Sequence, residues 1–350
     1  MIPTQRVPEV LHRARELVTP ALRAAVAQLS PELRPIAAYH LGWVDAHGQP
    51  IGGDGGKGVR QALAVLSAEA VGADGAVGTP GAVAVELVHN FSLIHDDVID
   101  EDAERRHRPT VWALFGIGRA VIVGDALLAL AQQVVLEPDT LEAAVAGGTG
   151  NDAGARAARC IADATAAMIA GQALDMAFES VPGVDVAGCL AMEAGKTGAL
   201  LGCAAAIGAV LAGAADDAVG ALDTYGMELG LAFQAVDDVL GIWGDPVATG
   251  KPAWSDLRQH KKTLPVAAAL AAGGPMAEEL ATILASEHLE EAQVARAALL
   301  VEECGGRSAA LAEADRRLAS ALDALERADL VPSAAAELAD VARFVVDRDF

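Results

Sequence analysis

The stretch HNFSLIHDDVIDEDAERRHRPT, His89–Thr110, decides how the rest of the chain is interpreted. It places six carboxylates in the nine residues from 96 to 104, directly after an apolar run, and three arginines follow them. Upstream, Thr79 and Pro80 are typical of a helix start, with a capping hydroxyl followed by a proline in the first turn. We therefore predict one long helix over about residues 80–102 that ends before RRHRPT.

Composition indicates helices throughout. The chain has 350 residues, of which 53% are hydrophobic but only 3% aromatic, so a core must be built from Ala, Leu, Val and Ile. Helical periodicity recurs along the sequence, and we find neither a linker nor a repeat. We predict a single all-α domain over residues 1–350, a bundle of many helices, in which Gly-rich residues 144–158 form a mobile loop.

The net charge of −23 excludes the basic surface that a nucleic-acid binder needs. The four cysteines show no metal-site spacing and are interpreted as small buried side chains in a reducing compartment. The charged N-terminus does not resemble a signal peptide, so we expect a cytoplasmic protein. The uncharged run Thr197–Ala215 approaches the length of a membrane span but is rich in Ala and Gly, and we predict a buried core helix instead.

The carboxylates in the opening stretch repel one another. Asp97 and Asp100 are three residues apart, and Asp96 and Asp100 four, so on a helix their side chains share one side. At about 5 Å and an effective dielectric constant of about 20, each such pair costs on the order of 3 kcal/mol. A solvated helix end is the simplest alternative, but it does not explain the apolar residues before the acids.

A second aspartate pair lies in LAFQAVDDVLGIWGDP, again inside an apolar helical pattern. Gln234, Asp237 and Asp238 are spaced by three and four residues and share a face. Two aspartate pairs in two apolar helices require a compensating cation. Oxygen ligands without clustered His or Cys select a hard ion such as Mg²⁺, which typically also binds substrate phosphate.

Basic residues accompany these acidic motifs in an otherwise acidic chain. Single lysines usually face solvent, but together these side chains predict anion-binding positions, and metal-binding carboxylates beside several cations indicate a diphosphate site. The residues are Lys57, Arg60, Arg105, Arg106, Lys196, Lys251, Lys261 and Lys262.

Nine motifs in one order carry a family resemblance: GGKGVR, HNFSLIHDDVID, ERRHRPT, GDALL, GQALD, GKTGAL, FQAVDD, GKPAWSDL and KKTLP, from about Gly55 to Pro265. The sequence resembles the trans-isoprenyl diphosphate synthases of the polyprenyl synthetase family. The resemblance implies an isoprenoid-synthase helical bundle around a central cavity, usually as a homodimer. It also implies the Mg²⁺-dependent head-to-tail condensation of isopentenyl diphosphate with allylic diphosphates.

The resemblance also implies a role for each matching residue. The Mg²⁺ ligands would be Asp96, Asp100 and Asp237, supported by Asp97 and Asp238, with three ions when substrate is bound. The allylic diphosphate would be bound by Arg105, Lys196, Lys251 and Lys261, and the reacting centre lined by Thr197 and Gln234. The isopentenyl diphosphate would be bound by Lys57, Arg60, His89 and Arg106. The metal would ionise the allylic bond, and the departing diphosphate would accept the proton.

Two departures from the family pattern are visible. Gly241 stands where the second motif often has a third aspartate, although Asp237 is retained. The chain ends in DRDF, without the basic tail that some members use to close the site.

Product length depends on residues one turn before the first aspartate motif. One helical turn rises about 5.4 Å, which is close to the length of one isoprene unit. Ser92 is small, and Phe91 is the nearby aromatic residue, a combination that resembles geranylgeranyl diphosphate synthases more than farnesyl diphosphate synthases. Phe91 could equally be ordinary core packing, and a farnesyl or longer-chain product remains the alternative.

Two other functions are open to this sequence. A class I terpene cyclase shares the first aspartate motif, but its second metal motif has no match here beyond the weak NDAGARAAR. A regulatory prenyl synthase subunit typically lacks the metal-binding aspartates, which this chain keeps.

Overall fold

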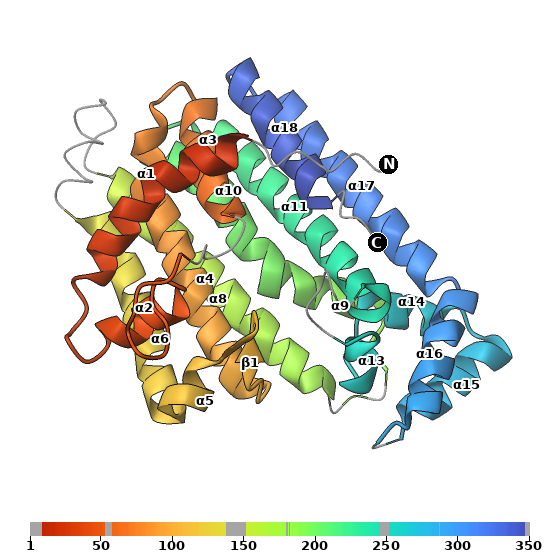
Figure 1. Ribbon diagram of the computed structural model, residues 1–350. Coiled ribbons are helices and arrows are strands. Elements are labelled where there is room, and N and C mark those ends of the chain that lie inside the picture. The colour runs from red at the N-terminus through yellow and green to blue at the C-terminus, as the bar shows by residue number, and fades with distance from the viewer. Residues whose placement is uncertain are drawn as a thin grey trace, which may run out of the picture. The chain divides into compact units, whose positions relative to one another are not determined.

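The computed structural model describes residues 9–52, 58–137, 152–179, 181, 183–245, 252–286 and 288–346, and Figure 1 shows their arrangement. The regular structure of these residues is helical except for two strands of two residues each, which confirms the predicted all-α class. Lys57, Lys251 and residues 144–151 of the predicted loop lie outside the described residues.

The chain divides into two compact units. The first unit comprises Met1–Thr165, Gly202–Asp223 and Leu325–Val341, and the second comprises Ala166–Leu201, Thr224–Ala324 and Ala342–Phe350. Their boundaries fall inside helices, among them α8 (Ala153–Glu179), α11 (Asp216–Trp243) and α17 (Gly306–Arg327). The prediction of a single domain stays a prediction.

Helix α4 (Thr79–Ile99) is the centre of the first unit and carries the first aspartate motif. α1 (Glu9–Val26), α3 (Val59–Ala70) and α6 (Ile117–Leu136) pack against it. Leu63, Leu66, Leu87 and Ile94 are completely buried in this core, made of aliphatic side chains as the composition predicts. The unit also contains α2 (Arg34–His40), η1 (Gly75–Gly78), α5 (Val111–Phe115) and most of α10 (Ala199–Leu211) and α18 (Pro332–Val346).

The ends of α4 differ slightly from the prediction. The 3-10 turn η1 leads directly into the helix, so Thr79 is already helical, Gly78 occupies the cap position, and no side chain caps the helix. The helix ends at Ile99 because Asp100 caps it and Glu101 adopts a positive φ of 56°. The spacing of the motif survives, since the Asp100 amide still donates to the Asp96 carbonyl at 2.8 Å.

A short hairpin that the sequence did not predict follows α4. Strands β1 (Glu104–Arg105) and β2 (Arg108–Pro109) pair antiparallel, joined by a two-residue turn. Both turn residues, Arg106 and His107, have positive φ, 52° and 59°, as a type I′ turn requires. The break at RRHRPT is therefore an ordered element that fixes the directions of its arginines.

Helix α8 begins earlier than predicted. Residues 153–158, assigned to a loop because of their glycines, form its first turns, so that part of the loop prediction is wrong. The predicted core helix is present as α10, all of whose residues are buried. By length and composition Ile117–Leu136 and Val186–Leu211 could each cross a membrane, but 78% of the apolar window in the latter is buried in the protein.

The second unit packs the C-terminal part of α11 with shorter helices. α9 (Val186–Glu193) passes into the π-helix η2 (Ala194–Gly198), and α13 (Ser255–Arg258), α14 (Leu264–Ala271), α15 (Gly274–Leu284) and α16 (Glu291–Glu303) follow α11. Ile242, Leu257, Val266, Leu280 and Val301 form an aliphatic core in this unit. The core holds the end of the helix that carries the second aspartate motif.

Gly208 allows α10 to approach α3 closely. Its amide donates to Ser67 Oγ at 3.0 Å, and a Cβ atom there would collide with the Ala64 carbonyl oxygen and Ser67 Oγ. We predict that Gly208→Ala lowers the free energy of unfolding by about 2 kcal/mol, because overpacking forces the two backbones apart. Gly220, exposed on α11 with open space around it, is the matched control. There an Ala should stabilise by about 0.5–1 kcal/mol, and equal effects of the two substitutions in urea unfolding would contradict the argument.

Candidate active site

The first aspartate motif divides its carboxylates between two environments. Asp97 is only 1% exposed, and Arg105 Nε donates to its Oδ1 at 2.7 Å. Burial raises the pKa of Asp97, and Arg105 opposes that shift. Asp96 is half-buried, and Asp100, the C-cap residue of α4, is exposed. Asp97 therefore anchors the hairpin, and Asp96 and Asp100 present their carboxylates at the surface of the unit.

The hairpin brings the predicted diphosphate-binding residues of the first unit together. Arg106 forms no ion pair with any described residue. Burial and the neighbouring Arg105 lower its pKa. His89 is half-buried on α4, and desolvation followed by the charges of Arg60 and Arg106 holds its pKa well below the usual range. His89, Arg60 and Arg106 are thus close neighbours, and the imidazole is neutral at physiological pH.

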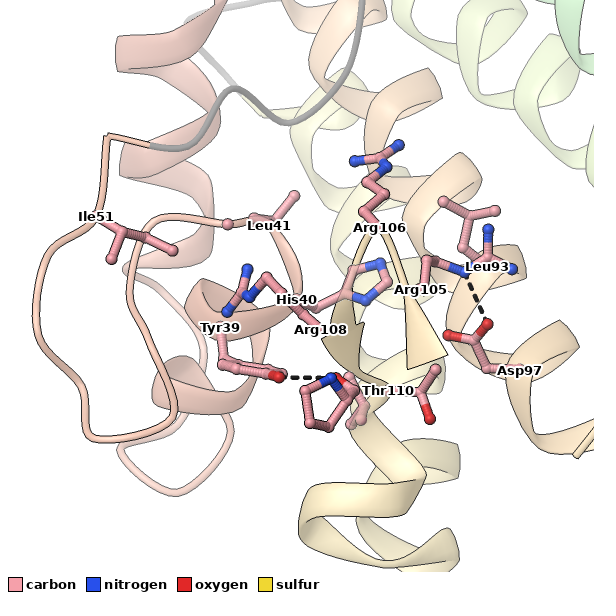
Figure 2. Close-up of a pocket in the computed structure, with 13 residues that line it drawn as sticks. Tyr39, His40, Leu41, Ile51, Leu93, Asp97, Arg105, Arg106, Arg108 and Thr110 are labelled. Atoms are coloured by element: carbon pink, nitrogen blue, oxygen red, sulfur yellow. Dashed lines mark hydrogen bonds and ion pairs between the residues drawn. The ribbon is translucent and has the colours of Figure 1, made fainter. Parts of the chain in front are cut away.

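A pocket of about 210 Å³ opens beside these residues. Figure 2 shows Arg105, Arg106 and Arg108 of the hairpin around it, together with Tyr39 and His40 of α2. Arg108 is held over the Tyr39 ring at 4.2 Å and donates to the Val44 carbonyl at 2.9 Å. A concave site walled by guanidinium groups is suited to a phosphate anion.

The second aspartate motif also has one buried carboxylate and one half-buried carboxylate. Asp238 is 4% exposed; one of its oxygens accepts from Gln234 Nε2 and the other from the Leu264 amide, both at 2.8 Å. Thr197 Oγ1 in turn donates to Gln234 Oε1 at 2.8 Å. Asp238 therefore holds α11, α14 and η2 together, whereas the neighbouring Asp237 is half-buried.

The GKTG motif forms the π-helix η2, an insertion that is frequent at functional sites. Lys196 Nζ lies 2.5 Å from Asp175 of the GQALD motif. Gly171 of that motif makes this approach possible, because a Cβ atom there would collide with the Lys196 amide. The two motifs are therefore one structural feature, and Asp175 is a site residue to which the sequence interpretation gave no role.

Glu193 and Cys189 are buried beside Asp238 and were also missed. The ligating atoms of these three side chains lie within 4.8 Å of one another, and Cys189 Sγ donates to Glu193 Oε1 at 3.1 Å. Burial and then the Asp238 charge raise the pKa of Glu193 to about 9. Burial also raises the pKa of Asp238, so the pair shares one proton at neutral pH. Glu193 stands three residues before Lys196, and this spacing is the one sequence feature that could have pointed to Glu193 as a neighbour of the site.

The structure also explains the departure at Gly241. A side chain there would occupy the space taken by the buried carboxylate of Asp256, which comes from α13 in the GKPAWSDL motif. Ser255 Oγ additionally donates to the Gly241 carbonyl at 3.2 Å. A carboxylate therefore stands beside this turn of α11 although the motif itself lacks its third aspartate.

The predicted chain-length residues lie on different sides of α4. Phe91 is buried at 6% exposure and packs edge-to-face on His95, with ring centroids 4.8 Å apart. His95 faces α6, where Nε2 lies 3.1 Å from the Val121 carbonyl and Gly124 leaves room for the ring. Ser92 is half-buried and donates to the His89 carbonyl at 2.9 Å. Phe91 therefore faces α6, on another side of the helix from the pocket.

The described aspartates of each unit, taken separately, have the chemistry of magnesium ligands. Asp96 and Asp100 in the first unit and Asp237 in the second offer carboxylate oxygens, the ligands that Mg²⁺ prefers. Lys261 is exposed, and its amide donates to the Asp256 carbonyl at 2.9 Å. The remaining predicted cations, Lys57 and Lys251, lie outside the described residues.

Comparison with known proteins connects this geometry to an enzyme family. The family model described as polyprenyl synthetase matches residues 42–301. A (2E,6E)-farnesyl diphosphate synthase of Mycobacterium tuberculosis H37Rv is 47% identical over 349 residues, which are 99% of this chain and 94% of the relative. A geranylgeranyl diphosphate synthase of the same strain is 43% identical over 325 residues, or 93% and 90% of the two chains.

Solved structures agree with these matches. A polyprenyl synthetase from Streptomyces coelicolor A3(2) is 52% identical with a TM-score of 0.90, covering 97% of this chain and 100% of its own. A polyprenyl synthase from Caulobacter crescentus CB15, complexed with calcium and isoprenyl diphosphate, is 29% identical with a TM-score of 0.80 and covers 99% of each chain.

The buried proton of Glu193 makes stability depend on pH. Because its pKa is raised from 4.5 to about 9, its contribution to stability is fully present below pH 4.5 and is lost as the pH rises toward 9. We predict that Glu193→Gln, which keeps a neutral side chain of the same size, gains stability relative to the unsubstituted protein between pH 5 and 8.5, by on the order of 2 kcal/mol. Urea unfolding across this range measures the difference, and parallel pH curves would show that Glu193 is not the titrating group.

Proposed function

The chain belongs to the polyprenyl synthetase family and is a prenyltransferase that elongates isoprenoid chains head to tail, and we propose that it makes geranylgeranyl diphosphate with Mg²⁺. Its helical architecture is that of the isoprenoid synthases. The observation that supports the proposal is the same division in both aspartate pairs, in which one carboxylate is buried and anchors the structure while its neighbour is half-buried.

Each carboxylate then has a distinct role. We assign Asp96, Asp100 and Asp237 as the residues that would hold the Mg²⁺ ions, three when substrate is bound. Mg²⁺ supplies the positive charge that stabilises the diphosphate leaving group as the allylic bond ionises. Asp97 and Asp238 keep the metal-binding residues in place through Arg105 and through Gln234 with the Leu264 amide.

The cations and polar groups complete the site. We assign Thr197 and Gln234, which are hydrogen-bonded to each other, to the lining of the reacting centre. We assign the two diphosphates to two sets of cations. Those for the allylic diphosphate are Arg105, Lys196, Lys251 and Lys261, and those for isopentenyl diphosphate are Lys57, Arg60, His89 and Arg106.

A twenty-carbon product is supported by the surroundings of Phe91. We assign the buried Phe91 as the aromatic barrier for the growing chain and the small Ser92 beside it as the residue that would leave space for a longer chain. A fifteen-carbon product is the second candidate, favoured by the 47% identity to a farnesyl diphosphate synthase.

A homodimer would cover an apolar surface of α6. Ile117, Val121, Ile122 and Leu136 are between 38% and 57% exposed on this helix. Burying such side chains is worth about 25 cal/mol per Å², so a second copy of the chain gains stability by covering them. We propose such a dimer in the cytoplasm.

Labelled isopentenyl diphosphate, incubated with the purified protein, Mg²⁺ and each allylic primer in turn, tests the proposed reaction. We predict incorporation of label, and a loss of roughly 10²-fold or more in Asp237→Asn because a metal ligand is removed. Asp217→Asn removes the same charge from the exposed start of α11 and should retain the rate. No incorporation with any primer would contradict the proposal, and hydrocarbons formed from geranylgeranyl diphosphate would indicate a cyclase.

Substitution of Phe91 tests product length separately. We predict that Phe91→Ala lengthens the dominant product by about one isoprene unit, because the next helical turn, about 5.4 Å further along, becomes the barrier. Leu93→Ala is the control, since Leu93 lines the arginine pocket and not the side of Phe91. Chain-length analysis of the dephosphorylated products measures both, and an unchanged distribution in Phe91→Ala would mean that another residue limits the chain.

A further inference from the structure

Two of the four cysteines contact each other across a pair of helices. Cys160 on α8 and Cys203 on α10 are 43 residues apart in sequence, and their sulfur atoms lie 3.1 Å apart in a hydrogen bond between two thiols. Cys160 is half-buried and Cys203 only 1% exposed, so the prediction of buried cysteines is confirmed for Cys203 and wrong for Cys160. One sulfur of the pair is therefore within reach of small molecules, and the other is enclosed by the protein.

The other two cysteines have different surroundings. Cys160 and Cys203 belong to the first unit, whereas Cys189 and Cys304 belong to the second. Cys189 is buried and donates to Glu193 Oε1 at 3.1 Å. Cys304 is half-buried and packs against the aliphatic core of its unit. Cys304 thus matches Cys160 in exposure and serves as a control for it.

The short distance between the sulfurs puts a disulfide within reach. A disulfide requires its two sulfur atoms to approach to about 2.05 Å. Starting from 3.1 Å, each sulfur has to move by only about half an ångström, which small rotations of the two side chains supply. Neither α8 nor α10 has to unfold or change its register for the bond to form.

Exposure and proton affinity give the two cysteines different parts in such a reaction. A cysteine reacts with an oxidant as the thiolate, and only where the oxidant reaches its sulfur. The hydrogen bond to Cys160, followed by burial, raises the pKa of Cys203, and the charges of Cys160 and Asp223 add to this shift. Cys203 therefore keeps its proton, and Cys160 is the sulfur that an oxidant meets first.

We propose that Cys160 and Cys203 form an oxidation site at which hydrogen peroxide converts the two thiols into a disulfide that joins α8 to α10. The Cys160 thiolate attacks one peroxide oxygen, the O–O bond breaks, and the leaving hydroxide takes up a proton, which gives a sulfenic acid and water. Cys203 then attacks the sulfur of the sulfenic acid, the S–O bond breaks, and the departing hydroxide leaves with the Cys203 proton as a second water. The two thiols lose two electrons, and one peroxide molecule gains them.

The bond is reversible and stabilising. Disulfides in cytoplasmic proteins are usually transient and redox-sensing. A thiol reductant restores the pair by attacking the half-buried Cys160 sulfur, because the Cys203 sulfur is enclosed. While it exists, the bond closes the loop between these two residues and so restricts the unfolded chain. This chemistry does not depend on the proposed prenyl transfer.

Peptide mapping of the full-length protein tests the proposal. Reduced protein is treated with a small excess of hydrogen peroxide, and the remaining thiols are alkylated in denaturant. A protease that cleaves after acidic residues then separates Cys160 from Cys189, which trypsin would leave in one peptide. We expect a crosslinked pair of peptides that contain Cys160 and Cys203, lighter by two hydrogens than the reduced peptides. Cys304→Ser should give the same pair, and Cys160→Ala and Cys203→Ala should give none.

Thermal unfolding of the same samples measures the consequence of the bond. We expect peroxide to raise the Tm of the unsubstituted protein by roughly 5 °C, because the crosslink removes conformational freedom from the unfolded chain. Dithiothreitol should reverse the rise. Cys304→Ser should show the same rise, and Cys160→Ala should show none.

Several results would overturn the proposal. Cys160 and Cys203 could both stay open to alkylation, or Cys160 could be oxidised to the sulfinic acid without a crosslink; either result would show that the two sulfurs do not pair in the folded protein. A crosslink between two chains would have the same meaning. A correct crosslink without a rise in Tm would show that the native packing does not accommodate the bond. The peptide map of the unsubstituted protein decides the question even if a variant fails to fold.

Discussion

Repulsion between neighbouring carboxylates is the constraint on which the rest of this structure depends. Each apolar helix with an aspartate motif places two acids side by side, at a cost of several kcal/mol unless each finds a partner. The protein resolves the conflict in the same way in both units. Asp97 is bound by Arg105, and Asp238 by Gln234 and the Leu264 amide, so in each pair one buried carboxylate is anchored by donors from other parts of the chain.

Anchoring one aspartate of each pair also connects distant segments of the chain. Asp97 fixes the hairpin that carries Arg106, and the type I′ turn then sets the direction of that guanidinium. Asp238 joins α11 to the start of α14, and through Gln234 to Thr197 in η2. Asp97 and Asp238 thus each do two things: each supports the neighbouring aspartate of its pair, and each positions an element to which we assign diphosphate binding.

Glycines leave the space that these polar groups occupy. Gly171 admits the π-helix that carries Lys196, and Gly241 admits Asp256, so an apparent loss in the second motif is matched by a carboxylate from another helix. Neither effect is visible in the spacing of one motif, because both depend on the approach of two backbones. The same reasoning applies to Glu193, whose retained proton follows from burial beside Asp238.

The sequence by itself determined the helical class, the two aspartate motifs and their face on each helix, because helix periodicity places residues three and four apart on one side. It also located the cations, with Lys57 and Lys251 outside the described residues. Only the tertiary structure decided which aspartate of each pair is anchored, that RRHRPT is a hairpin, and that residues 153–158 continue α8. Asp175 and Glu193 likewise become recognisable only in three dimensions, because partners more than twenty residues away in sequence decide whether such a side chain is paired or neutral.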